Sequence, residues 1–174
     1  MKNFTRLFAI LIFAAGVASC NNDDDCPAPV PAAERTIFVA NLHGENEVPP
    51  NGSLAEGNAV LIFNNTTKQF TLIGDYKGMT ATVAHIHGPA LAGVNAPTIF
   101  DLKVTPNSPA TTGIISYASS VPLTSAQEAD LMAGKYYVNI HSATYALPLG
   151  EIRGQLNKIG VASGGTGTGG GGGY

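Results

Sequence analysis

Short segments of alternating polar and apolar residues, separated by Gly, Asn and Pro, fill the chain from residue 34 to residue 158. A period of two is typical of strands with one buried face, so the pattern predicts a single all-β domain. The predicted strands cover residues 36–42, 57–63, 69–76, 81–87, 98–104, 113–119, 135–141 and 151–157. About eight strands in so short a unit predict a Greek-key β-sandwich or a barrel.

Alternate side chains of a strand lie on the same face, so each apolar series indicates a core-facing side. The series are Ala59, Leu61 and Phe63, then Phe70 and Leu72, then Tyr136, Val138 and Ile140. Asn64 and Asn65 predict a hairpin turn between two of these strands, because asparagine tolerates positive φ better than most residues.

One short connecting helix is expected after Thr124, whose side chain is suited to cap the first turn, with Gln127 three residues later. Leu131 and Met132 would then face the sheet. Gly134 favours a left-handed stop at the end of this helix.

The first part of the chain, residues 1–19, has the order of an export signal. Lys2 and Arg6 precede an apolar run over residues 7–17, which is too short for a transmembrane helix. The run ends in the tetrapeptide VASC at Cys20, which resembles the lipobox of bacterial lipoproteins, where this cysteine is lipidated and becomes the new N-terminus. We therefore expect a membrane anchor at Cys20; the alternative is an ordinary signal peptide with an incidental cysteine.

Residues 20–33 are acidic and proline-rich, which predicts an extended tether between the lipid and the domain. The acidic tract at residues 21–25 resembles the one that sends some Gram-negative lipoproteins to the outer cell surface; a plain solvated spacer is the alternative. We expect a lipid-anchored outer-membrane protein at the cell surface, with the periplasmic face as the other location. Residues 159–174 are Gly-rich and predict a disordered tail. Cys26 is the one remaining cysteine, so no internal disulfide is expected.

Composition and motifs restrict the function further. The nine basic residues are scattered singly among twelve acidic ones, so no nucleic-acid partner is expected. The sequence has no Gly-x-Ser-x-Gly elbow, no Gly-rich phosphate loop and no cysteine pairs at zinc-ribbon spacing. Glu45 and Glu47 lie two apart in one loop and lack the opposed geometry of glycosidase carboxylates. We therefore expect no catalytic residues and no enzymatic activity.

Three stretches together resemble the CHRD domain, a module named after the animal morphogen inhibitor chordin and also found in bacterial exported proteins. They are LHGENEVPP at residues 42–50, AHIHGPA at residues 84–90, and residues 136–156 with their closing GEIRGQL. The resemblance covers nearly the whole predicted domain. It implies an immunoglobulin-like β-sandwich or barrel, of unknown molecular role in bacteria and structural in chordin, with no catalytic residues to carry over.

The histidines are the candidate metal ligands. His85 and His87 are two apart on a predicted strand, so they project on one face about 7 Å apart, and both imidazoles can reach one ion. His141, at the end of another strand, is the candidate third ligand, and His43 is a more distant one. Imidazoles without thiolates suit copper, zinc or nickel, so copper or zinc would be the ion. Alternatively, each histidine hydrogen-bonds a loop carbonyl or carboxylate and holds the end of the fold together.

The histidine pattern is similar to the His-x-His plus remote histidine of copper-zinc superoxide dismutase. That enzyme needs a bridging histidine, further zinc ligands and an internal disulfide, whereas here no histidine lies between His87 and His141 and no cysteine pair is available. Dismutation is therefore not expected.

Charged residues near these motifs predict a structural ion pair. Glu151 and Arg153 share one face of a predicted strand, and Arg153 would make a bidentate pair with Glu45 or Glu47. The leading functional hypothesis is thus a non-catalytic cell-envelope lipoprotein whose domain serves as a binding, adhesion or structural module for a protein or glycan. The alternative is a copper- or zinc-binding protein.

Overall fold

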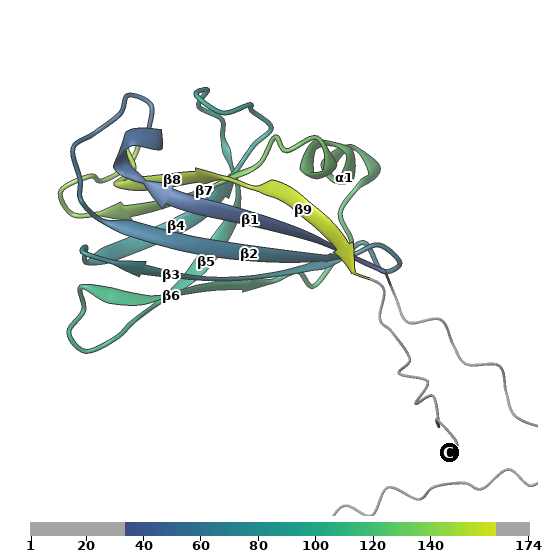
Figure 1. Cartoon of the computed structure of the whole chain (residues 1–174), viewed down its shortest axis with the longest axis horizontal. Coiled ribbons are helices and arrows are strands. Elements are labelled where there is room, and N and C mark those ends of the chain that lie inside the picture. The colour runs from purple at the N-terminus through teal and green to yellow at the C-terminus, as the bar shows by residue number, and fades with distance from the viewer. Residues whose placement is uncertain (1–33, 163–174) are drawn as a thin grey trace, which may run out of the picture. The chain divides into compact units, whose positions relative to one another are not determined.

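The structure, a computed structural model, describes residues 34–162 (Figure 1). The predicted signal at residues 1–19, Cys20, Cys26, the tether and the segment from residue 163 onward lie outside the described residues. Within the described range, no helix is both long and apolar enough to cross a membrane.

The elements of the described range are nine strands, one 3-10 turn and one α-helix. In chain order they are β1 (Arg35–His43), η1 (Gly44–Asn46), β2 (Glu56–Asn64), β3 (Phe70–Lys77), β4 (Ala81–His87), β5 (Thr98–Pro106), β6 (Thr112–Ala118), α1 (Ser125–Met132), β7 (Tyr137–Ser142), β8 (Ile152–Gln155) and β9 (Asn157–Ala162).

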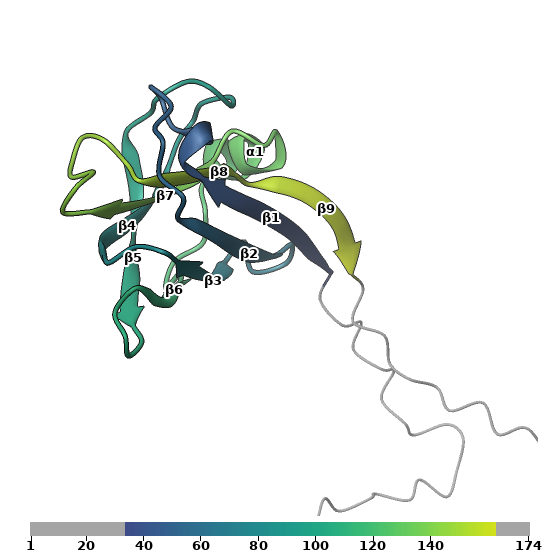
Figure 2. The same ribbon diagram turned by 60° about the vertical axis from the view of Figure 1, so that its left-hand side comes forward.

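Eight of the strands close into an antiparallel barrel. The order around it is β2-β3-β6-β5-β4-β7-β8-β1, and β1 also pairs with β2, so the sheet meets itself (Figures 1 and 2). The neighbours β3-β6-β5-β4 follow the Greek-key order. The prediction of an all-β fold with about eight strands and one short helix is confirmed, and of the sandwich and the barrel the chain adopts the barrel.

The barrel interior is filled by the predicted apolar series. The side chains of Leu61, Phe63, Val138 and Ile140 are completely buried, and Phe70 is 3% exposed. Helix α1 lies outside the strands, begins after a Thr124–Gln127 capping box as predicted, and buries Leu131 against the same core. Gly134 adopts the expected positive φ of 67°.

The hairpin between β2 and β3 is confirmed, but its turn is longer than the Asn64–Asn65 pair suggested. Asn64 acts through its side chain: its Oδ1 accepts hydrogen bonds from the backbone amides of Thr66 at 2.9 Å and Thr67 at 3.0 Å. The residue with positive φ is Lys68, at 57°. Asparagine therefore initiates this turn by mimicking a backbone carbonyl.

Strand β9 extends into the segment that was predicted to be a disordered tail. It pairs with β1 from Arg35 to Val39, whereas β8 pairs with β1 only at His43 (Figure 2). The two strands thus follow one another along β1 and satisfy its backbone groups. Residues 159–162 differ from the prediction because backbone pairing does not require apolar side chains, and composition alone does not report it.

Candidate metal centre

A row of polar side chains crosses the outer face of the barrel. Direct cross-strand partners lie on the same face of a sheet. The register pairs His85 of β4 with Asn139 of β7, Asn139 with Arg153 of β8, and Arg153 with His43 of β1. The neighbouring apolar residues Ile86 and Ile140 point inward, which places this row outside the core.

Loops cover this outer face, so its polar groups are buried. All six residues of β7 are buried, although only alternate ones face the core. The covering segments are fastened by side-chain bonds: Asn51 Nδ2 donates to the carbonyls of Gly150 and Glu151 at 3.1 Å, and Asn95 Nδ2 donates to that of Val48 at 3.0 Å. The result is a polar layer between the sheet and its loops, where each group needs a partner.

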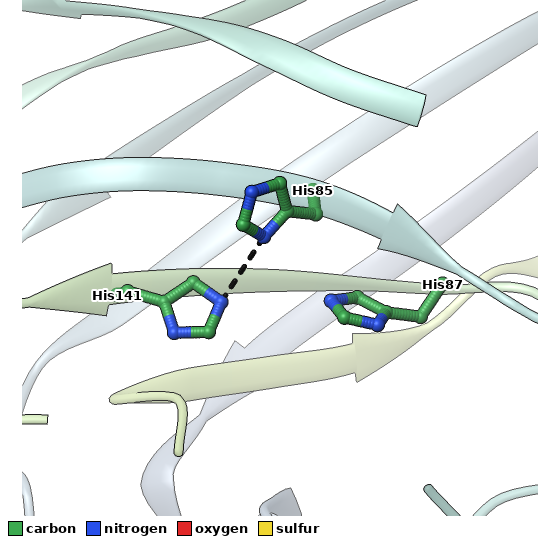
Figure 3. A group of neighbouring side chains, drawn as sticks. All are labelled: His85, His87 and His141. Atoms are coloured by element: carbon green, nitrogen blue, oxygen red, sulfur yellow. Dashed lines mark hydrogen bonds between the residues drawn. The ribbon is translucent and has the colours of Figure 1, made fainter. Parts of the chain in front are cut away.

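Three of the four histidines meet in this layer (Figure 3). His85, His87 and His141 each offer one ring nitrogen, and these three atoms lie within 4.8 Å of one another. His85 Nδ1 lies 3.2 Å from His141 Nε2, and His87 turns a ring nitrogen toward the other two rings. No Asp, Glu or Cys of residues 34–162 belongs to this group. We call it the histidine triad.

The second nitrogen of each ring faces an oxygen. His87 Nδ1 donates to the Ala96 carbonyl at 2.9 Å, and His141 Nδ1 donates to the Leu149 carbonyl. His85 Nε2 lies 3.7 Å from the exposed carboxylate of Asp101. The two carbonyl bonds fix the tautomers of His87 and His141, so Nε2 of each faces a point shared by the three rings. His85 faces the same point with Nδ1.

The three histidines of the triad favour the neutral form, which is the form that coordinates a metal ion. Burial lowers the pKa of His85, His87 and His141 below that of a free imidazole. Carbonyl bonds from Ala96 and Leu149 partly oppose this effect. Neutral imidazoles can coordinate a metal without first losing a proton to solvent, so the triad is available near neutral pH.

His87 is held by a stack of planar groups. Its ring lies parallel to that of Tyr137, with centroids 5.0 Å apart and an interplanar angle of 4°. The Arg153 guanidinium carbon lies 3.4 Å from the centroid of the Tyr137 ring. The hydroxyl of Tyr137 accepts from the Ala96 amide at 3.0 Å, so it also positions the carbonyl that orients His87.

Arg153 is paired differently from the prediction. It forms no ion pair within 4.0 Å with Glu45, Glu47 or Glu151 in the described part of the chain. Its guanidinium instead donates to Asn95 Oδ1 at 3.1 Å and to the Val94 carbonyl at 2.8 Å. Val94 and Asn95 of the covering loop thus accept the guanidinium hydrogen bonds that were predicted to go to a carboxylate.

The predicted carboxylate partners have separate environments. Glu45 is exposed, and Glu151 accepts a hydrogen bond from the Ser53 hydroxyl at 2.7 Å. Glu47 is 5% exposed and accepts from Asn139 Nδ2 at 3.3 Å. Arg153 therefore acts on Glu47 only through space, as a charge that lowers the pKa of its carboxyl.

Glu47 and Asn139 form a pair that the sequence analysis missed. Burial raises the pKa of Glu47 to about 7, against the lowering effects of Arg153 and Asn139. Glu47 Oε1 and Asn139 Oδ1 are both buried and have no hydrogen-bond partner in the described part of the chain, and both lie against Gly150. A proton on Oε1 would join these two oxygens and complete a two-bond acid–amide pair. The available sequence signal was that Asn139 lies two residues from His141, on the same strand face.

His43 does not join the triad. It ends β1 on the far side of Arg153 and Asn139 in the cross-strand row. The structure therefore brings together three of the four predicted histidine ligands.

These observations define a closed antiparallel β-barrel domain with a loop-covered histidine triad on its outer face. A comparison with protein families matches residues 38–156 to the CHRD domain, and the chain belongs to the CHRD domain family. Comparisons with curated proteins and with solved structures find no match.

Proposed function

We propose that this CHRD domain binds a transition-metal ion, copper or zinc, through His85, His87 and His141. A ligand set needs donor atoms at the spacing of a coordination shell. Imidazole nitrogens bind such ions at about 2.0–2.1 Å, which puts neighbouring donors of a tetrahedral site about 3.3 Å apart. The 3.2 Å between His85 Nδ1 and His141 Nε2 fits this spacing.

The observation that carries the proposal is the state of His87 Nε2. This atom is buried and has no hydrogen-bond partner among residues 34–162. A purely structural role would account for the carbonyl bond at Nδ1 but would leave Nε2 unsatisfied, which is costly in a buried position. An ion at the shared point would satisfy it and would also replace the proton between His85 and His141.

The sequence analysis led us to expect a non-catalytic cell-envelope binding module. The present proposal names a metal ion as the ligand of that module. No described contact supports a particular protein or glycan partner, whereas the triad and its three oxygen contacts support an ion. The proposal is one of binding, with no turnover.

Calorimetry with Cu(II) and Zn(II) on the full-length chain, stripped with chelator, tests the proposal. At least one ion is expected to bind with a Kd of about 1 μM or tighter. His87→Ala and His141→Ala are expected to weaken binding by at least about tenfold, since each removes one of three donors. Thermal melts of the metal-free variants check that they fold.

His43→Ala is the matched control, because His43 lies on the same outer face but outside the triad. It should leave the affinity unchanged. Absence of binding at micromolar concentration, or equal losses in His43→Ala and His87→Ala, would contradict the proposal.

We further propose that the chain is held at the outer membrane by lipid on Cys20, with the cell surface as the expected side. Radiolabelled fatty acid should be incorporated into the expressed chain and should be lost completely in Cys20→Ser, because the thiol is the acylation site. Cys26→Ser is the control and should retain the label. Equal labelling of both variants would remove the anchor from the account.

A further inference from the structure

The triad offers an ion no negative charge. Its three donors are neutral imidazoles, and the group contains no Asp, Glu or Cys of the described range. An ion held there keeps its full charge in a largely buried position, since the His85 side chain is only 11% exposed and His141 is 1% exposed.

The buried charge that packs on the histidine stack is positive. Arg153 is 2% exposed, and its guanidinium lies on the Tyr137 ring that stacks against His87. Arginine stays protonated at any physiological pH. Tyr137 connects this cation to the ligand ring: the guanidinium carbon lies 3.4 Å from the Tyr137 centroid, and the Tyr137 and His87 centroids are 5.0 Å apart. At this range Arg153 repels a bound cation in proportion to that ion's charge.

Negative groups near the site do little to offset this repulsion. The Asp101 side chain is 90% exposed, so water screens it, and it approaches His85 at the nitrogen turned away from the triad. Glu47 has a pKa of about 7 and is therefore about half ionised at pH 7, but its carboxylate bonds Asn139 and is not among the charges that shift the pKa of His85, His87 or His141.

The free energy of taking an ion out of water rises with the square of its charge, so a divalent ion costs about four times as much as a monovalent one. The repulsion from Arg153 is twice as large for the divalent ion. We propose that the triad selects Cu(I) over Zn(II). This inference rests on the proposed metal-binding function and extends it to the charge of the ion. Cu(I) is the monovalent state of a metal that imidazoles bind well.

Cu(I) and Zn(II) make a matched pair of probes, because both have a filled d shell and differ in charge. The full-length chain is used with Cys20→Ser and Cys26→Ser, because free thiols would themselves hold Cu(I). Anaerobic competition against bicinchoninate then measures Cu(I) binding, and competition against 4-(2-pyridylazo)resorcinol measures Zn(II) binding. At pH 7.5, Cu(I) is expected to bind at least about tenfold more tightly than Zn(II). Ag(I) is expected to compete with Cu(I) as a monovalent ion that does not change oxidation state under these conditions.

Variants of Arg153 test the electrostatic cause. Arg153→Met removes the positive charge and should increase the logarithm of the Zn(II) affinity by about twice as much as that of Cu(I). Arg153→Lys keeps the charge but loses the planar fork that holds Val94 and Asn95, so it should preserve the ratio of the two affinities. Melting curves for both variants establish that the compared proteins are folded.

Two results would overturn the inference and are distinguishable. If Zn(II) binds more tightly than Cu(I), and His87→Ala abolishes this binding, the proposed metal function stands and the selection for a monovalent ion is wrong. If neither ion binds, both fail. An unchanged affinity ratio in Arg153→Met would exclude Arg153 as the source of selection and would overturn its electrostatic basis.

Discussion

Gly150→Ala is expected to destabilise the domain by about 1 to 3 kcal/mol, the range for overpacking a filled site. A Cβ at this position would overlap Asn139 Oδ1 and Nδ2 on one side and Glu47 Oε1 on the other. Both side chains are 5% exposed and are bonded to each other, so neither can swing into solvent. Urea denaturation of the metal-free protein measures the loss.

Gly52→Ala is the matched control for this experiment. Gly52 is exposed in the preceding loop, and a Cβ there would meet nothing within 4 Å. Its effect should stay within about 0.5 kcal/mol. A similar small effect in Gly150→Ala would show that the acid–amide pair can move aside, and would contradict the packing described here.

Glu47→Gln is expected to remove a pH dependence of stability. The folded state raises the pKa of Glu47 from 4.5 to about 7, so between these values the folded chain holds a proton that the unfolded chain has released. The free energy of unfolding therefore falls as pH rises through this window. Below pH 4.5 both states are protonated, and the contribution is fully present.

The expected loss for the wild type is about 2 kcal/mol between pH 4.5 and pH 7.5, after allowance for partial solvent screening. A glutamine amide reproduces the protonated acid, with a donor for Asn139 Oδ1 and an acceptor for Nδ2. Glu47→Gln should accordingly be the more stable protein above pH 7 and nearly equal to wild type at pH 4.5.

Denaturation across this pH range, with chelator present, provides the measurement for Glu47→Gln. Glu45→Gln serves as the comparison, because Glu45 is exposed in the same loop. Parallel profiles for wild type and Glu47→Gln would show that Glu47 does not carry the buried proton.

The strands of the barrel were predictable because each buries one face. Period-two alternation identifies such segments without any long-range information, and this is why Leu61, Phe63 and Val138 were placed correctly. Closure was not predictable to the same degree. It depends on β1 pairing with both β2 and β8, and the register between strands far apart in the chain cannot be inferred from the pattern within either strand.

The candidate site was likewise predictable only in part. The two-residue spacing of His85 and His87 placed them on one face, and the order of the motifs suggested His141. The partners of Arg153 come from the loop after β4, whose path depends on bonds to residues far away in the chain. Loop conformations of this kind are set by tertiary contacts, so the sequence indicated a carboxylate partner where a loop amide and carbonyl lie.

The pairing of Arg35 with Ala162 means that the described chain enters and leaves the barrel at one pole. His43 is at the other end of β1, about 26 Å from Arg35 for the usual rise per residue of a strand. It belongs to the cross-strand row that contains His85. A support joined to either terminus would therefore hold the domain by its base. The cross-strand row would then lie toward the end of the domain farther from that support.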